Sequence, residues 1–482
     1  MLGVHRVAPR CPTPEGIARC AGVSITGTLK EGIRVDHASR SGATFIARLD
    51  RIPVWPYPRS VLAIVGAGFF FAYFDIVTIG FALPVISKQF NVSAEMASWS
   101  ITSGLIGYIL GSILDSRIGD RYGRRVSLFL SVAAFSIGSL LSATSPSLNW
   151  LIFWRFISGM GIGAEIALVT TYMAEVSPAP LRGRYTGWTI VCAFAGFAVV
   201  PLLALKIVPA YDWGWRFLFV VGALGGLLIG FMRRGLPDSI HWLVAQGRLE
   251  EAEAATVAAE KKAENVLGHA LPPPASSKPQ GEASEPPGLG IFLKPPLMGR
   301  LVLLGIIWFV YYVGNYGWLT LAPELFAKHG FSLTQSIASL SLTGFGFVAG
   351  AIAAVYTSDR VDRRRGAALL AVVWAIALAA IGVYASTVTI PVLGFLASFT
   401  IGYVIPLLYT ITGESFPTSV RATGVSLSDG FGHLGGAFCG QIILGVEAVQ
   451  GFEGAFFAMA ATGLATAVLV GFVRNHTGSQ LD

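Results

Sequence analysis

The chain has 482 residues, of which 54% are hydrophobic and only 13% are charged, and its formal net charge is +7. A soluble chain of this length would have about a quarter charged residues. The deficit of charge therefore excludes an ordinary soluble protein and indicates a polytopic membrane protein. The basic residues are dispersed among short loops, which argues against a nucleic-acid-binding surface. The four cysteines have neither zinc-site nor redox spacing, so we predict no disulfide framework.

The first 55 residues are polar, carry several arginines and lack the apolar core of a signal peptide. We expect the first forty of them to be disordered. In residues 43–55 apolar side chains recur at helical spacing, from Phe45 to Ile52. This pattern predicts a short helix lying on the inner membrane surface.

Twelve stretches are apolar over the length of about 20 residues that a helix needs to cross a membrane. Between the two sets of six, residues 247–266 are rich in Ala, Glu and Lys and should be helical. Residues 271–288 are rich in Pro and Ser and should form a flexible link. The predicted spans are 61–86, 97–117, 127–144, 148–173, 186–206, 214–232, 301–322, 334–357, 367–386, 390–412, 423–446 and 452–473.

The two sets of six spans are related by a tandem duplication. The segment Asp120-Arg121-Tyr122-Gly123-Arg124-Arg125 returns as Asp359-Arg360-Val361-Asp362-Arg363-Arg364, which gives an offset of 359 − 120 = 239 residues. The same offset relates six more pairs of identical residues: Pro84 and Pro323, Gly107 and Gly346, Gly111 and Gly350, Glu175 and Glu414, Pro178 and Pro417, and Arg182 and Arg421. We therefore predict an all-α membrane protein of two pseudo-symmetric six-helix halves, at 56–232 and 299–474.

The connections between spans differ in charge on the two sides of the membrane. One set contains eleven arginines and the other contains four basic residues: Arg117, Arg121, Arg124, Arg125, Arg182, Arg184, Arg360, Arg363, Arg364, Arg365 and Arg421 against Lys88, Lys206, Arg216 and Lys328. Because positive charge accumulates in cytoplasmic loops, we expect the N-terminal extension 1–55, the central loop 233–298 and the tail 475–482 to be cytoplasmic. The predicted location is the inner membrane.

The turn from Gly111 to Arg125, with its Gly-Asp-Arg-x-Gly-Arg-Arg sequence, resembles the signature of the major facilitator superfamily of transporters. A simple basic stop signal would explain the arginines of this turn but not its second copy. Gly123 suits a turn with positive φ. The resemblance implies alternating access around a central site. It also implies networks at the cytoplasmic helix ends, in which Glu175 with Arg182 and Glu414 with Arg421 join the two arginine-rich turns and stabilise one conformation.

Placing an ionisable side chain inside a membrane span costs about 2.5–3.5 kcal/mol of insertion free energy. Each such residue is therefore expected to have a partner or a function. Asp75 in the first span and Arg155 in the fourth resemble the proton-exchanging Asp and its Arg partner in proton-coupled symporters. Burial favours the neutral form of a carboxyl group and a nearby arginine favours its charged form. If Asp75 and Arg155 separate, Asp75 would therefore take up a proton. The alternatives are a static buried ion pair and no pairing between these residues.

Glu165 lies ten residues beyond Arg155, about 15 Å along a helix, and on a different face. Either it faces the cavity as a proton or substrate contact, or it bonds to a neighbouring span. The intervening Gly159, Gly161 and Gly163 lie inside an apolar span with no preceding strand, so we interpret them as close-packing residues rather than a dinucleotide loop.

Aromatic residues with a few polar groups are typical of a binding cavity, although aromatic residues are also ordinary at membrane interfaces. Asn315 lies well inside the seventh span, which favours cavity lining. His433 stands where related symporters often carry Arg, which weakens the case for a fixed cation. The predicted cavity residues are Trp308, Tyr311, Tyr312, Asn315, Tyr316, Asp429, His433 and Gln441.

The run from Gly163 to Arg184 looks most like the metabolite:proton symporters of bacterial inner membranes. The box expected after the last span of sugar porters is absent, since the chain reads Arg474-Asn475-His476-Thr477-Gly478 there. We therefore predict proton symport of a small metabolite, with organic acids ranked above hexoses. A sugar symporter, a proton antiporter exporting drug-like compounds and a transport-dead sensor are the alternatives.

The expected partners are a small-molecule substrate, protons and membrane lipid, and the expected state is a monomer. The sequence contains no cluster of metal ligands and no nucleophile with its base. We therefore predict neither an enzyme nor a cofactor.

Overall fold

A computed structural model describes residues 44–274, 288–358 and 360–474. The predictions that concern residues 1–43, 275–287 and 475–482, residue Asp359 and the side chain of Asp120 lie outside this description. The described residues form helices and connecting turns without a strand, so the predicted all-α class is confirmed.

The N-terminal half consists of six long helices, and each covers one of the predicted spans to within one residue. They are α2 (Arg59–Gln89), α3 (Ala94–Tyr122), α4 (Arg124–Ala143), α5 (Leu148–Val176), α6 (Arg182–Ile207) and α7 (Gly214–Met232). Serine side chains cap the helices that follow two of the tight turns: Ser93 accepts a hydrogen bond from the Met96 amide, and Ser147 accepts one from the Trp150 amide.

The C-terminal half repeats this order with more interruptions. Its elements are α10 (Leu297–Tyr316), the π-turn η5 (Gly317–Leu321) and α11 (Ala322–Lys328), then α12 (Leu333–Ser341) and α13 (Thr343–Thr357), α14 (Arg363–Val383), α15 (Thr389–Glu414), α16 (Arg421–Ala437) and α17 (Cys439–Gly471).

The described part of the chain has eleven apolar helical segments that are long enough to cross a membrane. The last of these, Arg421–Gly471, has 51 residues, more than twice the length of one crossing. Within it, α17 breaks at Gly451, whose φ of 72° is not helical. The segment therefore provides two spans, as predicted.

The duplication is visible in the helix packing as well as in the sequence. A Cβ atom on Gly107, Gly111 or Gly163 would lie within 3 Å of the backbone oxygen of Phe156, Met160 or Tyr108, where α3 crosses α5. The residues 239 positions later repeat each contact where α13 crosses α15: Gly346 with Phe395, Gly350 with Phe399 and Gly402 with Phe347. Close backbone approach through glycine is how helices pack in lipid.

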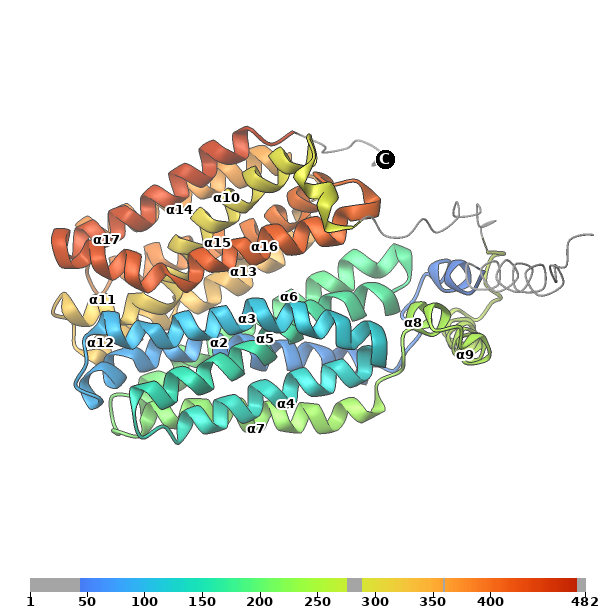
Figure 1. Cartoon of the computed structure of the whole chain (residues 1–482), viewed down its shortest axis with the longest axis horizontal. Helices are drawn as coiled ribbons and strands as arrows, with labels where there is room; N and C mark the ends of the chain where they lie inside the picture. Colours follow the sequence, from blue (N-terminus) through green and yellow to red (C-terminus); the bar gives the residue numbers. More distant parts are fainter. Residues whose placement is uncertain (1–43, 275–287, 359, 475–482) are drawn as a thin grey trace, which may run out of the picture.

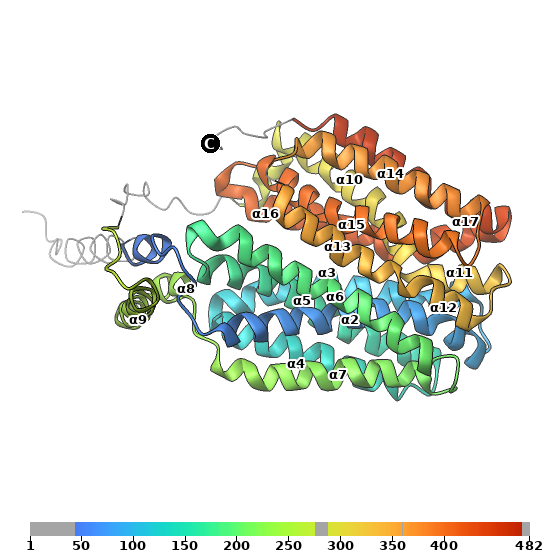
Figure 2. The same cartoon turned by 180° about the vertical axis from the view of Figure 1, so that it is seen from behind.

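Two further helices, α8 (Ile240–Ala245) and α9 (Leu249–Leu267), lie at one end of the bundle (Figures 1 and 2). This end also carries Arg124 and Arg363, and we call it the arginine-rich end. The other end, which carries α11, is called the opposite end. The helices of the two halves converge towards the opposite end and spread apart towards the arginine-rich end (Figure 1).

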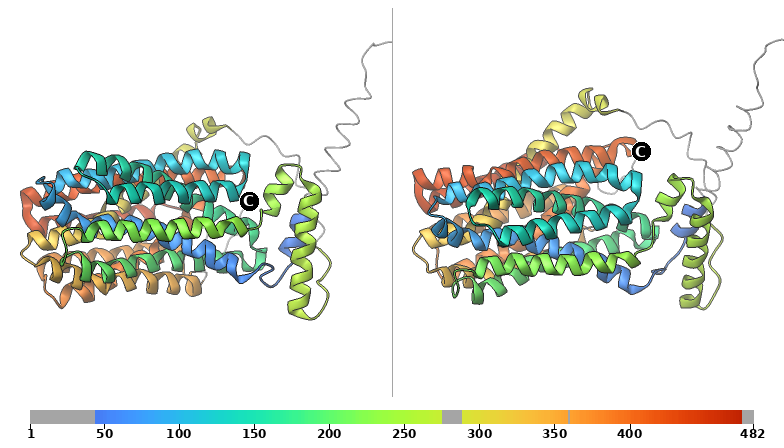
Figure 3. Two further views of the ribbon diagram at one scale, coloured as in Figure 1. Left: turned by 90° about the horizontal axis from the view of Figure 1, so that it is seen from below. Right: turned by 60° about the horizontal axis from the view of Figure 1, so that its bottom comes forward.

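Residues 44–50 are helical, as predicted, but their environment differs from the predicted membrane surface. The side chains of Leu49 and Ile52 are fully buried against Ile240, Leu243 and neighbouring apolar residues of α8 and α9, and Figure 3 shows this helix beside α9. Arg48 also donates two hydrogen bonds to Glu260, at 3.0 and 2.6 Å. The apolar stripe is therefore covered by protein and is not free to enter a membrane.

Candidate coupling and substrate site

Asp75 and Arg155 form a buried ion pair between α2 and α5. The Arg155 Nη1 atom lies 2.5 Å from Asp75 Oδ2, and the two residues are 3% and 1% exposed. Ser158 donates a hydrogen bond of 3.1 Å to Asp75 Oδ2, and Ser139 of α4 donates one to Oδ1. The expected pairing is present, and each of the two serines gives the Asp75 carboxylate one further hydrogen bond.

The duplication shows that the fold does not need this polar cluster. The positions 239 residues after Asp75, Ser139, Arg155 and Ser158 are Gly314, Leu378, Gly394 and Ala397. The C-terminal half therefore builds the same framework with apolar residues at all four places. Because buried charge is costly in a membrane, a cluster that only one half retains indicates a role beyond holding helices together.

Glu165 forms a second buried pair, with Arg233 at the end of α7. Arg233 Nη1 lies 2.6 Å from Glu165 Oε2, and a second hydrogen bond joins Nη2 to Oε1. Ser131 donates to the same carboxylate at 2.8 Å, and Arg233 also donates to the Leu128 carbonyl oxygen at 2.8 Å. Of the two alternatives for Glu165, the structure has the bonded one. From the sequence, Arg233 belongs to the central loop, because it directly follows an apolar span; the structure places its side chain inside the bundle.

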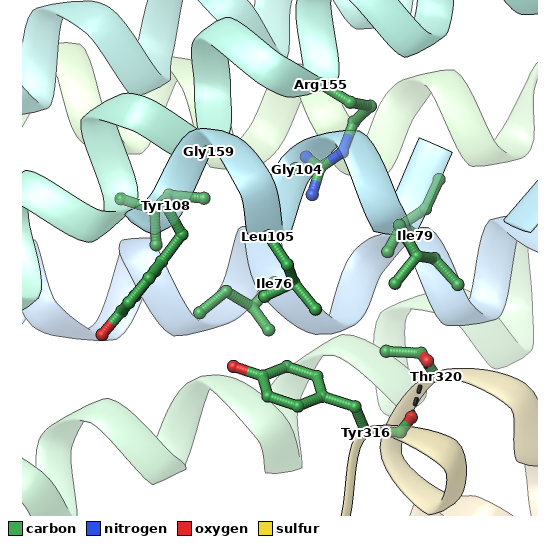
Figure 4. Close-up of a pocket in the computed structure, with 11 residues that line it drawn as sticks. Ile76, Ile79, Gly104, Leu105, Tyr108, Arg155, Gly159, Tyr316 and Thr320 are labelled. Atoms are coloured by element: carbon green, nitrogen blue, oxygen red, sulfur yellow. Dashed lines mark hydrogen bonds between the residues drawn. The ribbon is translucent and has the colours of Figure 1, made fainter. Parts of the chain in front are cut away.

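A small cavity lies between the two halves, beside the first ion pair (Figure 4). The guanidinium group of Arg155 reaches it from α5, Leu105 and Tyr108 line it from α3, and Tyr316 and Thr320 line it from α10 and η5. Its volume of about 20 Å³ is enough for about one water molecule. In this conformation the cavity is therefore too small to hold a metabolite.

Asp429 and His433 of α16 lie among tyrosines from both halves. Tyr312 and Tyr409 donate hydrogen bonds of 2.9 and 2.8 Å to Asp429 Oδ1, and His433 Nδ1 lies 3.4 Å from Oδ2. The His433 ring stacks on Tyr108 of the N-terminal half, with 4.0 Å between ring centroids and 15° between planes. The sequence does not single out Tyr108 and Tyr409 as site residues, because a tyrosine in an apolar span has no distinguishing pattern.

Most of the other predicted cavity residues do not line the cavity. Tyr316 lines the cavity. Trp308 donates a hydrogen bond of 2.9 Å to Thr412, and Tyr311 packs on Trp374, so both contact other helices of the C-terminal half. Asn315 is buried at 4% exposure.

Gln441 does not line the cavity and contacts the first turns of α3, which begin at the opposite end. Its Nε2 atom donates to Ser98 and Thr102 of α3, at 3.3 and 3.2 Å. It therefore joins the two halves rather than lining the central site.

At the arginine-rich end, equivalent ion pairs join the helix ends of each half. Arg124 pairs with Glu175 at 3.0 Å, and Arg363 pairs with Glu414, each partner 239 residues further on. Arg182, the expected partner of Glu175, instead lies 3.0 Å from Asp50 of the N-terminal helix. Gly123 has the predicted positive φ, 96°.

The remaining motif residues contact neighbouring backbone or ring atoms. Arg125 donates to the Arg234 carbonyl oxygen, Arg364 donates to that of Val473 at 3.2 Å, and Arg421 donates to that of Phe416 at 3.4 Å. The Arg121 guanidinium lies 5.4 Å from the centroid of the Tyr122 ring. Arg360 is exposed.

Comparisons with known proteins identify the family. The Sugar (and other) transporter family matches residues 60–480. The niacin transporter NiaP of Acinetobacter baylyi is 28% identical over 90% of this chain and 97% of its own, and the 4-hydroxybenzoate transporter PcaK of Pseudomonas aeruginosa is 26% identical over 82% and 88%. The xylose transporter XylE of Escherichia coli, in a partially occluded inward open conformation, has a similar fold, with a TM-score of 0.71 and 20% identity over 88% of this chain and 99% of that one. The chain therefore belongs to the Sugar (and other) transporter family and is a major facilitator superfamily transporter of the sugar or metabolite type, not an enzyme.

Proposed function

We propose that the protein is a proton-coupled symporter that takes up a small organic acid by alternating access. The observation that carries this proposal is the buried Asp75–Arg155 pair, whose arginine also lines the cavity between the halves. The relatives named as niacin and 4-hydroxybenzoate transporters support an organic acid, because both of those compounds are carboxylic acids.

The coupling follows from competition for one arginine. When a substrate carboxylate binds Arg155, Asp75 loses its partner, and an unpaired buried carboxylate favours its neutral, protonated form. Substrate and proton are then carried together. When the substrate leaves on the other side, Arg155 pairs with Asp75 again and the proton is released.

We further propose that the arginine-rich end faces the cytoplasm, as the distribution of basic residues favours. Single cysteines at Asn265 of α9 and at Thr387, which is exposed at the opposite end, would be introduced after replacement of the native cysteines. An impermeant thiol reagent added to intact cells should label Thr387→Cys and spare Asn265→Cys. The reverse pattern would refute this orientation.

Uptake by the full chain in proteoliposomes tests the coupling. The wild type should concentrate benzoate, a simple organic acid, when a pH gradient is imposed. Asp75→Asn should abolish this uphill uptake and leave exchange down a benzoate gradient, because the carboxyl group that carries the proton is gone. Asp50→Asn, which removes a carboxylate paired at the surface with Arg182, is the matched control and should retain uphill uptake. Continued gradient-driven accumulation by Asp75→Asn would contradict the proposal.

The alternatives predict different results in the same assay. An exporter that exchanges protons for its substrate would release benzoate from loaded proteoliposomes when the outside is acidified. A sensor without transport would show neither uptake nor exchange.

A further inference from the structure

We infer that the transported acid has a flat aromatic ring, and that Tyr108 and His433 form the subsite that binds this ring. The inference rests on the proposed function, because it assigns the carboxylate of the same substrate to Arg155. It names a subsite and a substrate class that the coupling pair alone does not specify.

The lining of the cavity fits an apolar body with a single charged group. Ile76, Ile79, Ile101, Leu105 and Ile162 provide five aliphatic side chains. A hexose carries a hydroxyl group on nearly every carbon, and each hydroxyl buried without a partner is costly. A cavity with this lining satisfies few of them. An aromatic ring, by contrast, gains from contact with aliphatic walls.

Arg155 has hydrogen-bonding capacity that Asp75 does not use. Its Nη1 atom binds Asp75, while its Nε atom is buried and has no hydrogen-bond partner among the described residues. An unsatisfied buried donor costs free energy, and a planar guanidinium is suited to bind a carboxylate through two parallel hydrogen bonds. The guanidinium therefore has a donor available for a substrate anion that enters the cavity.

Tyr108 lines the cavity together with Tyr316 (Figure 4), and His433 lies directly behind the Tyr108 ring, outside the cavity lining. His433 stacks on Tyr108 across the interface between the halves and lies 4.5 Å from the Tyr312 ring and 5.9 Å from the Tyr316 ring. Because the two stacked rings belong to different halves, movement of the halves separates them. A flat ring about 3.5 Å thick can then take the place between them, whereas a puckered ring is thicker.

Asp429 orients the histidine and does not act as a free anion. Its carboxylate already receives hydrogen bonds from Tyr312 and Tyr409. Its backbone carbonyl oxygen lies 2.9 Å from His433 Nδ1. A tyrosine cage with an uncompensated carboxylate would favour a cation. The two tyrosine donors on Asp429 and the Arg155 guanidinium at the cavity favour an anion instead.

Calorimetric titration of the purified full chain with benzoate and with cyclohexanecarboxylate tests this inference. The two probes share the carboxylate and the ring size and differ in flatness. Stacking should make benzoate bind about five- to tenfold more tightly than cyclohexanecarboxylate.

Variants of the two stacked rings test their part in this preference. Tyr108→Leu and His433→Leu should each bring the ratio of the two affinities close to one, while His433→Phe should retain the preference. Phe347→Leu, at the position 239 residues after Tyr108, removes a comparable ring from the other half and should leave the ratio unchanged.

Each other outcome overturns a defined part of the inference. Equal affinity of the wild type for both acids would refute the ring subsite while leaving proton-coupled transport of an organic acid intact. Binding of neither acid would refute the organic-acid proposal as well. Binding of benzyltrimethylammonium in place of benzoate would show that the tyrosines select a cation. Gel filtration checks that both leucine variants are folded. If these folded variants still prefer benzoate, the substrate ring binds somewhere else.

Discussion

Two arginines lie in the interior of the N-terminal half, and each contacts one carboxylate. Arg155 pairs with Asp75 beside the cavity, whereas Arg233 pairs with Glu165 and bonds the Leu128 carbonyl oxygen. A Cβ atom on Gly68 of α2 would collide with the Arg233 guanidinium. Arg233 therefore ties α7 to α4 and α5 and also requires a glycine on α2, which indicates a structural role for the second pair.

Arg233→Leu should destabilise the protein strongly, because Glu165 would remain buried without its partner. Breaking a buried ion pair from one side costs about 3–5 kcal/mol. The double variant Glu165→Val with Arg233→Leu should recover most of this loss, since the C-terminal half has Val404 and Phe472 at the equivalent positions. Thermal unfolding of detergent-purified protein measures both effects, with Arg234→Leu as the neighbouring control. A double variant no more stable than the single one would contradict this prediction.

At the scale of elements, glycines set the distance between the crossing helices α3 and α5. A Cβ on Gly111 would lie within 3 Å of the Met160 backbone oxygen, whereas a Cβ on Gly445 of α17 has no atom within 4 Å. Gly111→Ala should therefore separate the helices and lower the unfolding temperature. Gly445→Ala should leave it unchanged or raise it, because alanine favours a helix by up to about 1 kcal/mol over glycine. Equal unfolding temperatures for the two variants would show that the crossing can relax.

Much of this architecture could be predicted from the sequence, because membrane spans and repeated motifs have clear patterns. The twelve spans, the duplication and the pairing of Asp75 with Arg155 are confirmed. The π-turn at Gly317–Leu321 could not be predicted, since nothing in its composition differs from a regular span. Neither could the positions of Tyr108 and Tyr409, because helices that are apolar on all sides do not reveal which face meets which neighbour.

At the scale of the whole molecule, the two halves are held together at the end away from the arginine-rich turns. Thr102 of α3 donates a hydrogen bond of 2.7 Å to the Ala437 carbonyl oxygen, and Gln441 donates to Ser98 and Thr102. By contrast, the Arg124–Glu175 and Arg363–Glu414 pairs each join helices of the same half. Polar contacts between the halves at one end bias the protein towards the conformation that is closed at that end.

Gln441→Leu should shift the protein towards the conformation open at the opposite end. Each neutral hydrogen bond contributes about 1 kcal/mol, so losing the Gln441 contacts should change the ratio of the two conformations by about fivefold or more.

Distances between pairs of spin labels measure this shift. Labels at Met96 and Val449, both exposed at the opposite end, should move apart in the variant. Labels at Val126 and Leu369, exposed near the arginine-rich end of each half, should move together. Thr410→Val removes only a hydrogen bond within α15 and should change neither distance. If both distances in Gln441→Leu match the wild type, the contacts at the opposite end do not set the balance. The Arg124–Glu175 and Arg363–Glu414 pairs at the arginine-rich end would then be the next candidates.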